Sequence, residues 1–218
     1  MIIDQRVEKI YQIIRNGGLV IFPSNVGYAL FGHSDESMQL MFQIKQRPYT
    51  KASVVIGNLS ILEEVAKLTK KIREAIEFVV KDYPCAFIVP ANESSTYLNK
   101  LGRWALKNLI TDGYIAVFLN IGDLATQLVV LGEKEHFLII GSSANHSGAG
   151  NNYIFSEVEK EITDAVQGSI DDGPSRYTHP QNRGTTIINF FNNSIQRDGI
   201  LCTEILIRLK ECGIIINK

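Results

Sequence analysis

The sequence has few cysteines, and their positions exclude the common cysteine-based sites. It contains three among 218 residues, Cys85, Cys202 and Cys212, which lie far apart and show no Cys-x-x-Cys spacing. An odd number of scattered cysteines predicts reduced, mostly buried thiols, as in cytosolic proteins. The four histidines lack the spacing to paired carboxylates that a metal site requires. The sequence therefore predicts no metal site.

Long apolar runs and an excess of one charge are also missing. No run approaches the ~20 apolar residues that a membrane-spanning helix needs. The opening MIIDQRVEKIYQ contains acids and no long apolar core, so it does not resemble a secretory signal. With 22 basic and 23 acidic side chains the net charge is −1, which argues against a surface that grips nucleic acid throughout but leaves a local basic patch open. We expect a cytoplasmic protein.

The usual signatures of catalysis and of division into domains are absent as well. The chain has no Gly-x-x-x-x-Gly-Lys-Ser/Thr phosphate loop, and no Ser-His-Asp set or catalytic pair of carboxylates stands out. We find no internal repeat, no low-complexity tract and no linker long enough to separate two domains. The prediction is one domain over residues 1–218.

What the sequence does contain is an ordinary balance for a folded protein, 45% apolar and 21% charged. Apolar runs predict strands at 19–23, 52–57, 85–90, 114–120, 136–141 and 213–217, and a hairpin over 185–198 that turns at Asn192–Asn193. Amphipathic spacing and caps predict helices at 4–16, 34–45, 59–67, 69–81, 123–131, 155–162 and 203–211. Because strands and helices mix without a strict βαβ rhythm, we predict a single α/β domain with a mixed sheet.

Two polar segments follow predicted elements. PSNVGYAL, residues 23–30, comes after a strand and is typical of a connection from strand to helix. KQRPYTK, residues 45–51, comes after a helix. On a continuing helix Lys45 and Arg47 would diverge by roughly 200°, but in a non-helical exit they could converge on one anion. The alternative is that these cations only offset the helix dipole.

A third polar segment, GSSANHSGAG at 141–150, follows a predicted buried strand. It is either a solvent-facing connection or a cradle whose hydroxyls and backbone N–H groups surround an anion. His146 is the one histidine that we place near a ligand. Arg183 and Arg197 lie at ends of the predicted hairpin, where arginines are usually solvated charges. Each segment is a weak signal alone, and together they gain weight if they meet at one place.

Taken in order, these segments resemble the signature of the YrdC-like family, whose best-known members are threonylcarbamoyl-AMP synthases. The matching stretches are GGLVIFPSNVGYAL, IKQRP, SSANHSG, GTTIIN and QRDG, within residues 4–205. The resemblance implies a YrdC-like α/β fold, a single domain with a twisted open mixed sheet flanked by helices, and a positively charged cavity. It also implies a reaction that joins ATP, bicarbonate and threonine into threonylcarbamoyl-AMP with release of pyrophosphate, for tRNA modification.

The resemblance also implies roles for particular residues. The implied nucleotide contacts are Lys45, Arg47, Ser143, Asn145, Thr185 and Arg197, with Lys45 and Arg47 at the catalytic centre, and the implied substrate contacts are Ser24, Tyr28 and Ser143. No protein nucleophile is needed, because the protein would supply positioning and positive charge. Mg²⁺ is expected to accompany ATP. Further expected partners are another small acceptor in place of threonine, a tRNA or double-stranded RNA, and a partner transferase.

The chain departs from the family pattern on the threonine side. PSNVGYAL replaces Pro-Thr-x-Thr-x-Tyr-Gly-Leu, and Phe118 stands where an arginine for the amino-acid carboxylate is expected. One interpretation is an enzyme that uses another acceptor, or carbamoyl phosphate, in place of threonine. A second is a non-catalytic nucleotide- or RNA-binding protein. A third is a displaced alignment in which Arg103 or another arginine serves. A chance match in an unrelated fold would leave residues 23–28, 45–47 and 141–148 without a shared cavity.

Overall fold

One mixed sheet organises the computed structural model, which describes residues 2–48 and 51–217. In the described residues the strand order is β10-β9-β4-β6-β3-β7-β2-β1-β8, and β5 pairs with β6 off this path. The pairs β1–β8, β3–β6 and β4–β9 are parallel and the others are antiparallel. The strands are β1 (Val20–Ser24), β2 (Gly27–Gly32), β3 (Val54–Ile56), β4 (Cys85–Pro90), β5 (Ile110–Thr111), β6 (Tyr114–Leu119), β7 (Ile139–Ser143), β8 (Gly168–Ser169), β9 (Ile187–Asn189) and β10 (Ser194–Arg197).

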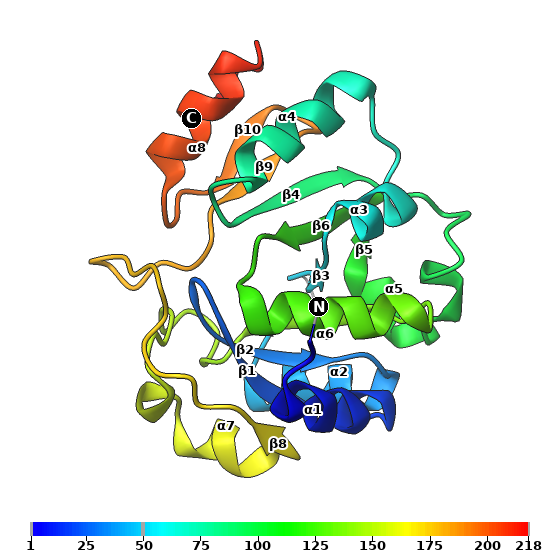
Figure 1. Ribbon diagram of the computed structural model, residues 1–218, viewed down its shortest axis with the longest axis vertical. Helices are drawn as coiled ribbons and strands as arrows, with labels where there is room; N and C mark the ends of the chain where they lie inside the picture. The colour runs from blue at the N-terminus through cyan, green and yellow to red at the C-terminus, as the bar shows by residue number, and fades with distance from the viewer. Residues whose placement is uncertain (1, 49–50, 218) are drawn as a thin grey trace.

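Helices flank this sheet, as the sequence predicts. They are α1 (Gln5–Arg15), α2 (Asp35–Ile44), α3 (Leu59–Val65), α4 (Lys70–Val80), α5 (Arg103–Leu109), α6 (Asp123–Lys134), α7 (Lys160–Ala165) and α8 (Cys202–Glu211), with short 3₁₀ turns η1 (Leu98–Lys100) and η2 (Phe155–Glu157). In Figure 1, α6 crosses in front of the central strands with α1 below it, and α4 and α8 lie with β4, β9 and β10 in the upper half. None of the described helices is long and apolar enough to cross a membrane.

The predicted capping and amphipathic patterns explain where the first helices begin. Asp4 accepts a hydrogen bond from the backbone N–H of Arg6 at the start of α1, and the predicted apolar stripe of that helix is buried. Ser34 caps α2 by accepting from the backbone N–H of Ser37, as expected. Such caps satisfy backbone donors that the first turn of a helix leaves unpaired. Gly17, at φ 87°, follows the end of α1 in a conformation that glycine adopts without strain.

The largest difference from the sequence prediction is at residues 23–30, which do not connect a strand to a helix. Instead the chain turns at Asn25 and Val26, and β2 runs back antiparallel to β1, with Ser24 opposite Gly27. Gly27 has φ 131°, and a Cβ there would overlap the side chain of Asn151. The tight hairpin therefore depends on a glycine, and it places β2 beside β7, at the edge of the later site.

Smaller differences concern short elements. The predicted helix at 155–162 is divided into η2 and α7, and α5 was not predicted. The predicted last strand at 213–217 contributes only a single bridge between Ser194 and Asn217. The predicted hairpin over 185–198 is confirmed as β9 and β10, with Asn193 at φ 52° in its turn. Tyr49 and Thr50 of the KQRPYTK segment lie outside the described residues.

Candidate functional site

A small hollow lies over one face of the central strands, and we call it the strand hollow. Its volume is about 130 Å³. Its lining residues are Ser24, Val26, Gly27, Tyr28, Ala29, Phe31, Arg47, Ala52, Ser53, Val54, Ile56, Phe118, Gly141, Ser142, Ser143, Asn151, Gly184, Thr185, Ile187 and Arg197. The predicted segments at 23–30, 45–51, 141–150 and 183–197 therefore all contribute to one site, as their resemblance to the family signature requires.

The floor of the hollow is apolar because alternate strand residues point to opposite faces of the sheet. Val54 and Ile56 of β3 line the hollow, whereas Val55 between them is fully buried in the core. Phe118 of β6 is opposite Ile56 and belongs to the same floor. Gly141 of β7 leaves the room that this floor needs, since a Cβ there would lie 2.8 Å from the ring of Phe31 and 3.0 Å from Ile56.

Arg47 is the best-oriented cation of the hollow. Its guanidinium donates from Nε to the carbonyl oxygen of Lys51 at 3.1 Å and from Nη2 to that of Ala52 at 2.5 Å, and Nη1 lies 3.4 Å from Ser142 Oγ. It also lies over the ring of Phe42, 5.4 Å from the centroid. An arginine side chain has five N–H donors, so two have no acceptor among the described residues.

Arg197 enters the hollow from the other side, at the end of β10. Its Nε donates to the carbonyl oxygen of Thr185 at 2.7 Å, and no described residue accepts from its two terminal nitrogens. Much of its surface is exposed at the open side of the hollow, yet the protein atoms around it lower its pKa. The terminal nitrogens form the planar fork that suits a carboxylate or a phosphate.

The two arginines lack acidic partners and repel each other. Burial, and then the nearby charge of Arg197, lower the pKa of Arg47 to about 10. Neither arginine forms an ion pair with a described carboxylate, and no described Asp or Glu lines the hollow. A partly buried charge without a partner is costly. The arrangement favours an anion that neutralises both groups.

Lys45 does not converge with Arg47 on the hollow. Its side chain is fully buried, and its ammonium donates to the carbonyl oxygens of Ser143 and Asn145, the latter at 2.6 Å. Burial is the main cause that lowers its pKa to about 7, with the charge of Arg47 second. Its own carbonyl oxygen accepts from the N–H of Ser147 at 2.9 Å. Lys45 thus ties the end of α2 to the loop after β7.

The expectation that N–H groups of the 141–150 loop surround an anion is not met. The N–H groups of Ala144, Asn145 and Ser147 donate to backbone oxygens at 2.8–3.1 Å. That of His146 donates to Oε1 of Glu159 at 3.2 Å. These donors are used within the protein, and Glu159 adds negative charge beside them. The loop contributes Ser142 and Ser143 to the hollow, whereas Asn145 and His146 lie outside its lining.

The hydroxyls of two other predicted residues serve the structure. Ser24 Oγ closes the β1–β2 turn, donating to the carbonyl oxygen of Gly27 at 2.5 Å and accepting from the N–H of Val26 at 3.2 Å. Thr185 Oγ1 lies 3.4 Å from the carbonyl oxygen of Thr186, which is a long contact. The backbone carbonyl oxygen of Thr185 accepts from Arg197 at the shorter distance of 2.7 Å and so contributes more clearly to the hollow. Both residues line the hollow, and their role as ligand contacts stays a prediction.

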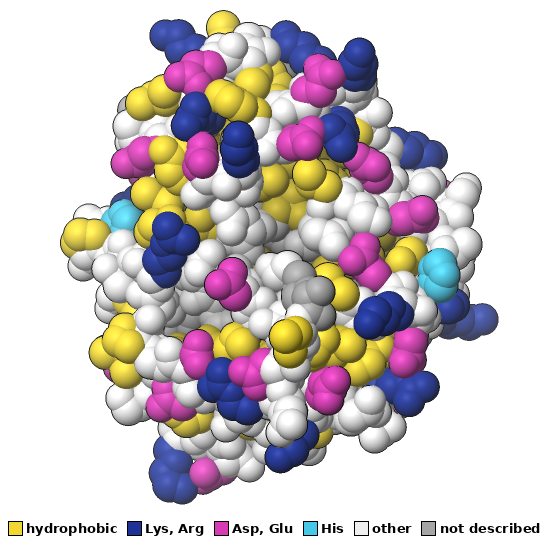
Figure 2. All heavy atoms as spheres, in the orientation of Figure 1, with side chains coloured by type: hydrophobic (Ala, Val, Ile, Leu, Met, Phe, Trp, Pro, Cys, Tyr) yellow, Lys and Arg dark blue, Asp and Glu magenta, His cyan; other side chains and the backbone are white. Residues whose placement is uncertain are grey.

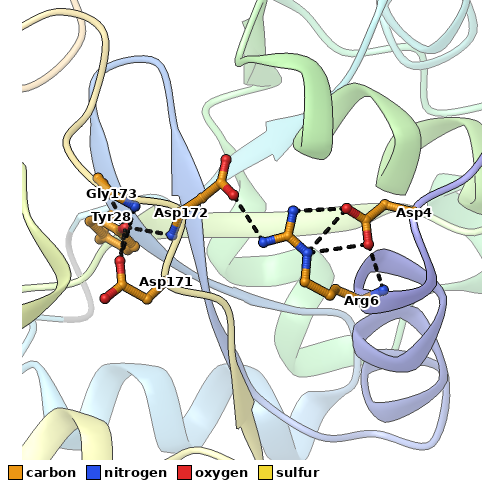
Figure 3. A network of polar contacts seen from close by, with 6 residues as sticks. All are labelled: Asp4, Arg6, Tyr28, Asp171, Asp172 and Gly173. Carbon is orange, nitrogen blue, oxygen red and sulfur yellow. Dashed lines mark hydrogen bonds and ion pairs between the residues drawn. The ribbon is translucent and has the colours of Figure 1, made fainter.

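Tyr28 lines the hollow, but its hydroxyl anchors a distant segment (Figure 3). That oxygen lies 3.0 Å from Oδ1 of Asp171 and 2.8 Å from the carbonyl oxygen of Gly173, and it accepts from the N–H of Asp172 at 3.1 Å. Burial raises the pKa of Tyr28 to about 12. Asp172 in turn pairs with Arg6 at 2.9 Å, which links the segment to α1.

Sequence reasoning missed two polar residues of the hollow, Ser53 and Asn151, whereas Ser142 belongs to the predicted anion loop. Ser53 has 1% of its surface exposed, and its Oγ has no hydrogen-bond partner among the described residues. Asn151 donates from Nδ2 to the carbonyl oxygen of Val26, which braces the hairpin turn. Ser142 faces Arg47. The position of Ser53 between a cationic loop and a strand was a usable signal, whereas Asn151 had none in sequence.

Phe118 occupies the position at which a carboxylate-binding arginine was expected. Only 7% of its surface is exposed, and it lines the apolar floor. Arg103 does not replace that arginine, because it begins α5 and is not among the residues of the hollow. Of the described arginines, only Arg47 and Arg197 line the hollow.

The described residues offer no cluster that would hold a metal ion. No group of three or more His, Cys, Asp or Glu side chains converges among residues 2–48 and 51–217. Mg²⁺ usually takes one or two carboxylates together with substrate phosphates. Since the described lining of the hollow contains no carboxylate, its residues do not fit a protein-held Mg²⁺, and we assign no step to one.

The protein is an α/β protein with an open mixed sheet and a small hollow, lined by two cations, over the central strands. The model of the Sua5, YciO and YrdC family, described as telomere recombination, matches residues 12–199. The chain belongs to this family.

Solved structures agree with the fold. The hypothetical protein smu.1377c of Streptococcus mutans has a TM-score of 0.78 at 20% identity, over 96% of this chain and 91% of that one. P. abyssi Sua5 in complex with L-threonine gives 0.75 at 21% identity, over 96% of this chain and 58% of its own. E. coli YciO gives 0.68 at 18% identity, over 88% of each chain. At these identities the likeness shows the fold alone, and this chain spans little more than half of Sua5.

Proposed function

We propose that the protein forms threonylcarbamoyl-AMP, or a related carbamoyl-adenylate, from ATP, bicarbonate and a small amine-bearing acceptor, for tRNA modification. Family membership supports this reaction class. The observation that carries it is the pair Arg47 and Arg197, two cations that face one hollow without a described acidic partner. A substrate that carries a triphosphate supplies the missing negative charge.

The reaction needs no protein nucleophile. The amine nitrogen of the acceptor attacks the carbon of bicarbonate, a C–N bond forms and water leaves, which gives a carbamate. A carbamate oxygen then attacks the α-phosphorus of ATP, and the bond to the bridging oxygen breaks as pyrophosphate leaves. The protein's part is to hold the reactants together and to neutralise the charge that develops on the phosphate oxygens.

The lining of the hollow suits these tasks. Arg47, held by its three acceptors, is positioned in advance for a phosphate or carboxylate, and Arg197 offers its free fork from the opposite side. Two nearby cations and the absence of a lining carboxylate disfavour an ammonium, so a bound amine is kept in its neutral, nucleophilic form. Lys45 acts at one remove, because it holds the carbonyl groups of the loop that carries Ser143.

The size of the hollow determines which parts of the substrates it can hold. At about 130 Å³ it is well below the volumes of drug-sized pockets, which run from roughly 300 to 1,000 Å³. It therefore takes the small acceptor and the reacting phosphate, and the rest of ATP extends through the open side where Arg197 is exposed.

Turnover tests the proposal directly. The purified protein is incubated with ATP, bicarbonate and single amino acids, and pyrophosphate and the adenylate are measured. We expect acceptor-dependent pyrophosphate release that falls at least about 100-fold in Arg197→Gln and is unchanged in Arg176→Gln, a cation over Tyr177 outside the hollow. No release with any of the twenty amino acids would refute the reaction.

A non-catalytic nucleotide- or RNA-binding role is the second candidate, and Phe118 favours it. An apolar floor in place of a carboxylate-binding cation is expected if amino-acid binding has been lost. On the face in Figure 2, Lys and Arg are interspersed with Asp and Glu, so that face offers no extended basic area. If a tRNA or double-stranded RNA binds elsewhere, through its phosphates, affinity should fall steeply with salt. RNA binding without pyrophosphate release would select this role.

A further inference from the structure

The strand hollow changes from polar to apolar along β3. Ser53 immediately precedes this strand, and Ile56, three residues further on, ends it. Three residues of extended chain cover about 10 Å. The neighbouring strand β7 runs antiparallel, with Val54 opposite Gly141 and Ile56 opposite Ile139, so Ser142 and Ser143 lie toward the Ser53 end. The hollow thus has a hydroxyl-rich end and an apolar end.

Some polar groups at the polar end have no hydrogen-bond partner among the described residues. Ser53 Oγ is buried and unpartnered among the described residues, although Ser53 lines the hollow. Arg47 is adjacent, because its Nη2 donates to the carbonyl oxygen of Ala52, and two of its N–H donors have no acceptor among the described residues. A hydroxyl and a guanidinium that both line this end of the hollow suit one oxyanion, with the Ser53 side chain rotating toward it.

The apolar end is closed by carbon. Phe118 and Ile56 are opposite each other in register, and Phe31 and Ile187 complete the floor, with the cation Arg197 opposite Ile187 on the outermost strand. A polar group in contact with Phe118 and Ile56 would lose its water and gain no partner from these two side chains. The end therefore suits a short hydrocarbon.

We propose that the strand hollow selects an acceptor with one carboxylate and a short aliphatic body, the chemistry of L-valine rather than L-threonine, and that Ser53 and Phe118 set this choice. The inference rests on the proposed function, of which it names the acceptor class. The carboxylate lies between Arg47 and Ser53, and the aliphatic side chain packs on Phe118. Threonine has the same shape as valine but would place its hydroxyl against the apolar floor.

Calorimetric titration of the purified chain with L-valine and L-threonine tests the choice without turnover. An apolar pocket rejects an isostere that adds a hydroxyl by about 100-fold at most, so we expect valine to bind about ten to a hundred times more tightly. Threonine binding as tightly as valine, or more tightly, would overturn the proposal. Binding of carbamoyl phosphate but of no amino acid would also overturn it.

Two variants assign the roles. Ser53→Ala should weaken both amino acids about tenfold, because a hydrogen bond to a charged group is lost. Its matched control is Ser175→Ala, which removes another buried, unpartnered hydroxyl outside the hollow and should change nothing. Phe118→Ala enlarges the apolar end and should weaken valine about tenfold while L-leucine gains. A merely structural residue would not produce that gain.

Further controls keep failure informative. Phe118→Leu is the milder variant if Phe118→Ala does not fold, and it should shift the preference in the same direction. Phe190→Leu, at 8% exposure and packed on Phe87, matches Phe118 in burial outside the hollow and should leave the preference unaltered. An unchanged valine preference in both Phe118 variants overturns that residue's role. If ATP and pyrophosphate bind but valine does not, the acceptor class is wrong; if they too fail to bind, the proposed function itself fails.

Discussion

Two concavities of very different size lie on the molecule, one between α1 and α6 and one over the central strands, and the smaller is the better candidate site. The larger, the α1–α6 groove, measures about 620 Å³ and is lined by Gln5, Glu8, Lys9, Tyr11, Gln12, Leu131, Lys134 and Glu135. Its charges have both signs, and Glu135 pairs with Arg15 at 2.8 Å. The strand hollow has about a fifth of that volume, as 130 against 620 Å³ shows, but its two cations are without described acidic partners.

The difference teaches that an uncompensated charge indicates a site better than volume does. The charged side chains of the groove are exposed to solvent, and an exposed pair such as Arg15–Glu135 contributes little to stability. In the hollow, the repulsion between Arg47 and Arg197 is relieved only when an anion arrives. The groove is therefore the natural internal control for every experiment on the hollow.

The largest difference between the strand hollow and the α1–α6 groove should appear in pyrophosphate affinity when Arg47 is changed to alanine. Pyrophosphate binding should weaken about 100- to 1,000-fold, or roughly 3–4 kcal/mol, since removal of an arginine takes away charge-assisted hydrogen bonds and leaves Arg197 alone. Lys134→Ala removes a cation from the groove and should leave the affinity within about twofold. Calorimetry with pyrophosphate measures both. Equal effects of the two variants would contradict the distinction between the concavities.

A second and smaller effect concerns Lys45 and pH. Its pKa is about 7 in the folded protein against an ordinary 10.5. Between these values the unfolded chain binds the proton that the folded chain has lost, so stability rises with pH across this window; below pH 7 both states hold the proton and the full cost of the buried charge remains. The stability of the wild type relative to Lys45→Met should therefore increase by roughly 3 kcal/mol from pH 7 to 10.

Urea unfolding at several pH values between 6 and 10 measures this difference, and the midpoint of each curve is compared at constant slope. Differences taken against the variant remove the contribution of the other titrating groups. Parallel pH profiles for the two proteins would mean that the Lys45 ammonium is not held in a desolvated position beside Ser143 and Asn145.

The smallest effect contrasts the tyrosine of each concavity. Tyr28→Phe should lower the free energy of unfolding by about 1–2 kcal/mol, because the N–H of Asp172 and the carboxylate of Asp171 lose a buried partner. Tyr11→Phe, in the groove, should change it by less than about 0.5 kcal/mol, since the Tyr11 hydroxyl has no hydrogen-bond partner in the described structure. Thermal and urea unfolding of both variants provide the measurement. A larger loss in Tyr11→Phe would reverse the order.

Much of the fold was readable from local patterns. The stripe of α1, the Ser34 cap and the run at β4 each depend on residues close together in sequence, and each prediction is confirmed. The β2 strand was not readable, because a turn at Asn25 and Val26 lacks the Asn-Gly or Gly-x pair that usually marks a two-residue hairpin. Position 27 in this strand requires glycine because the side chain of Asn151, more than 120 residues away in sequence, occupies the space of a Cβ.

The site was predictable as a set of segments but not as a set of contacts. The order of motifs brought Arg47, Ser143 and Arg197 to one hollow, as expected. Whether a cation faces a ligand or a carbonyl depends on the last turn of α2, and two residues of separation were enough to direct Lys45 into the protein and Arg47 into the hollow. Likewise, the N–H groups of Ala144 and Ser147 found acceptors on distant segments, Tyr28 and Lys45, that no local pattern discloses.

Arg197 belongs to β10, the outermost strand on its side of the described sheet, where the pairing with β9 is irregular between Ile195 and Arg197. Peripheral ladders open most easily, so this strand frays before the middle does. A small polyanion bound by the guanidinium groups of both Arg47 and Arg197 would link this edge strand to the interior of the protein. The two arginines are 150 residues apart in sequence. Slow amide exchange in β10 would then show that an anion is bound in the hollow. Opening of this edge strand would set the rate at which product leaves.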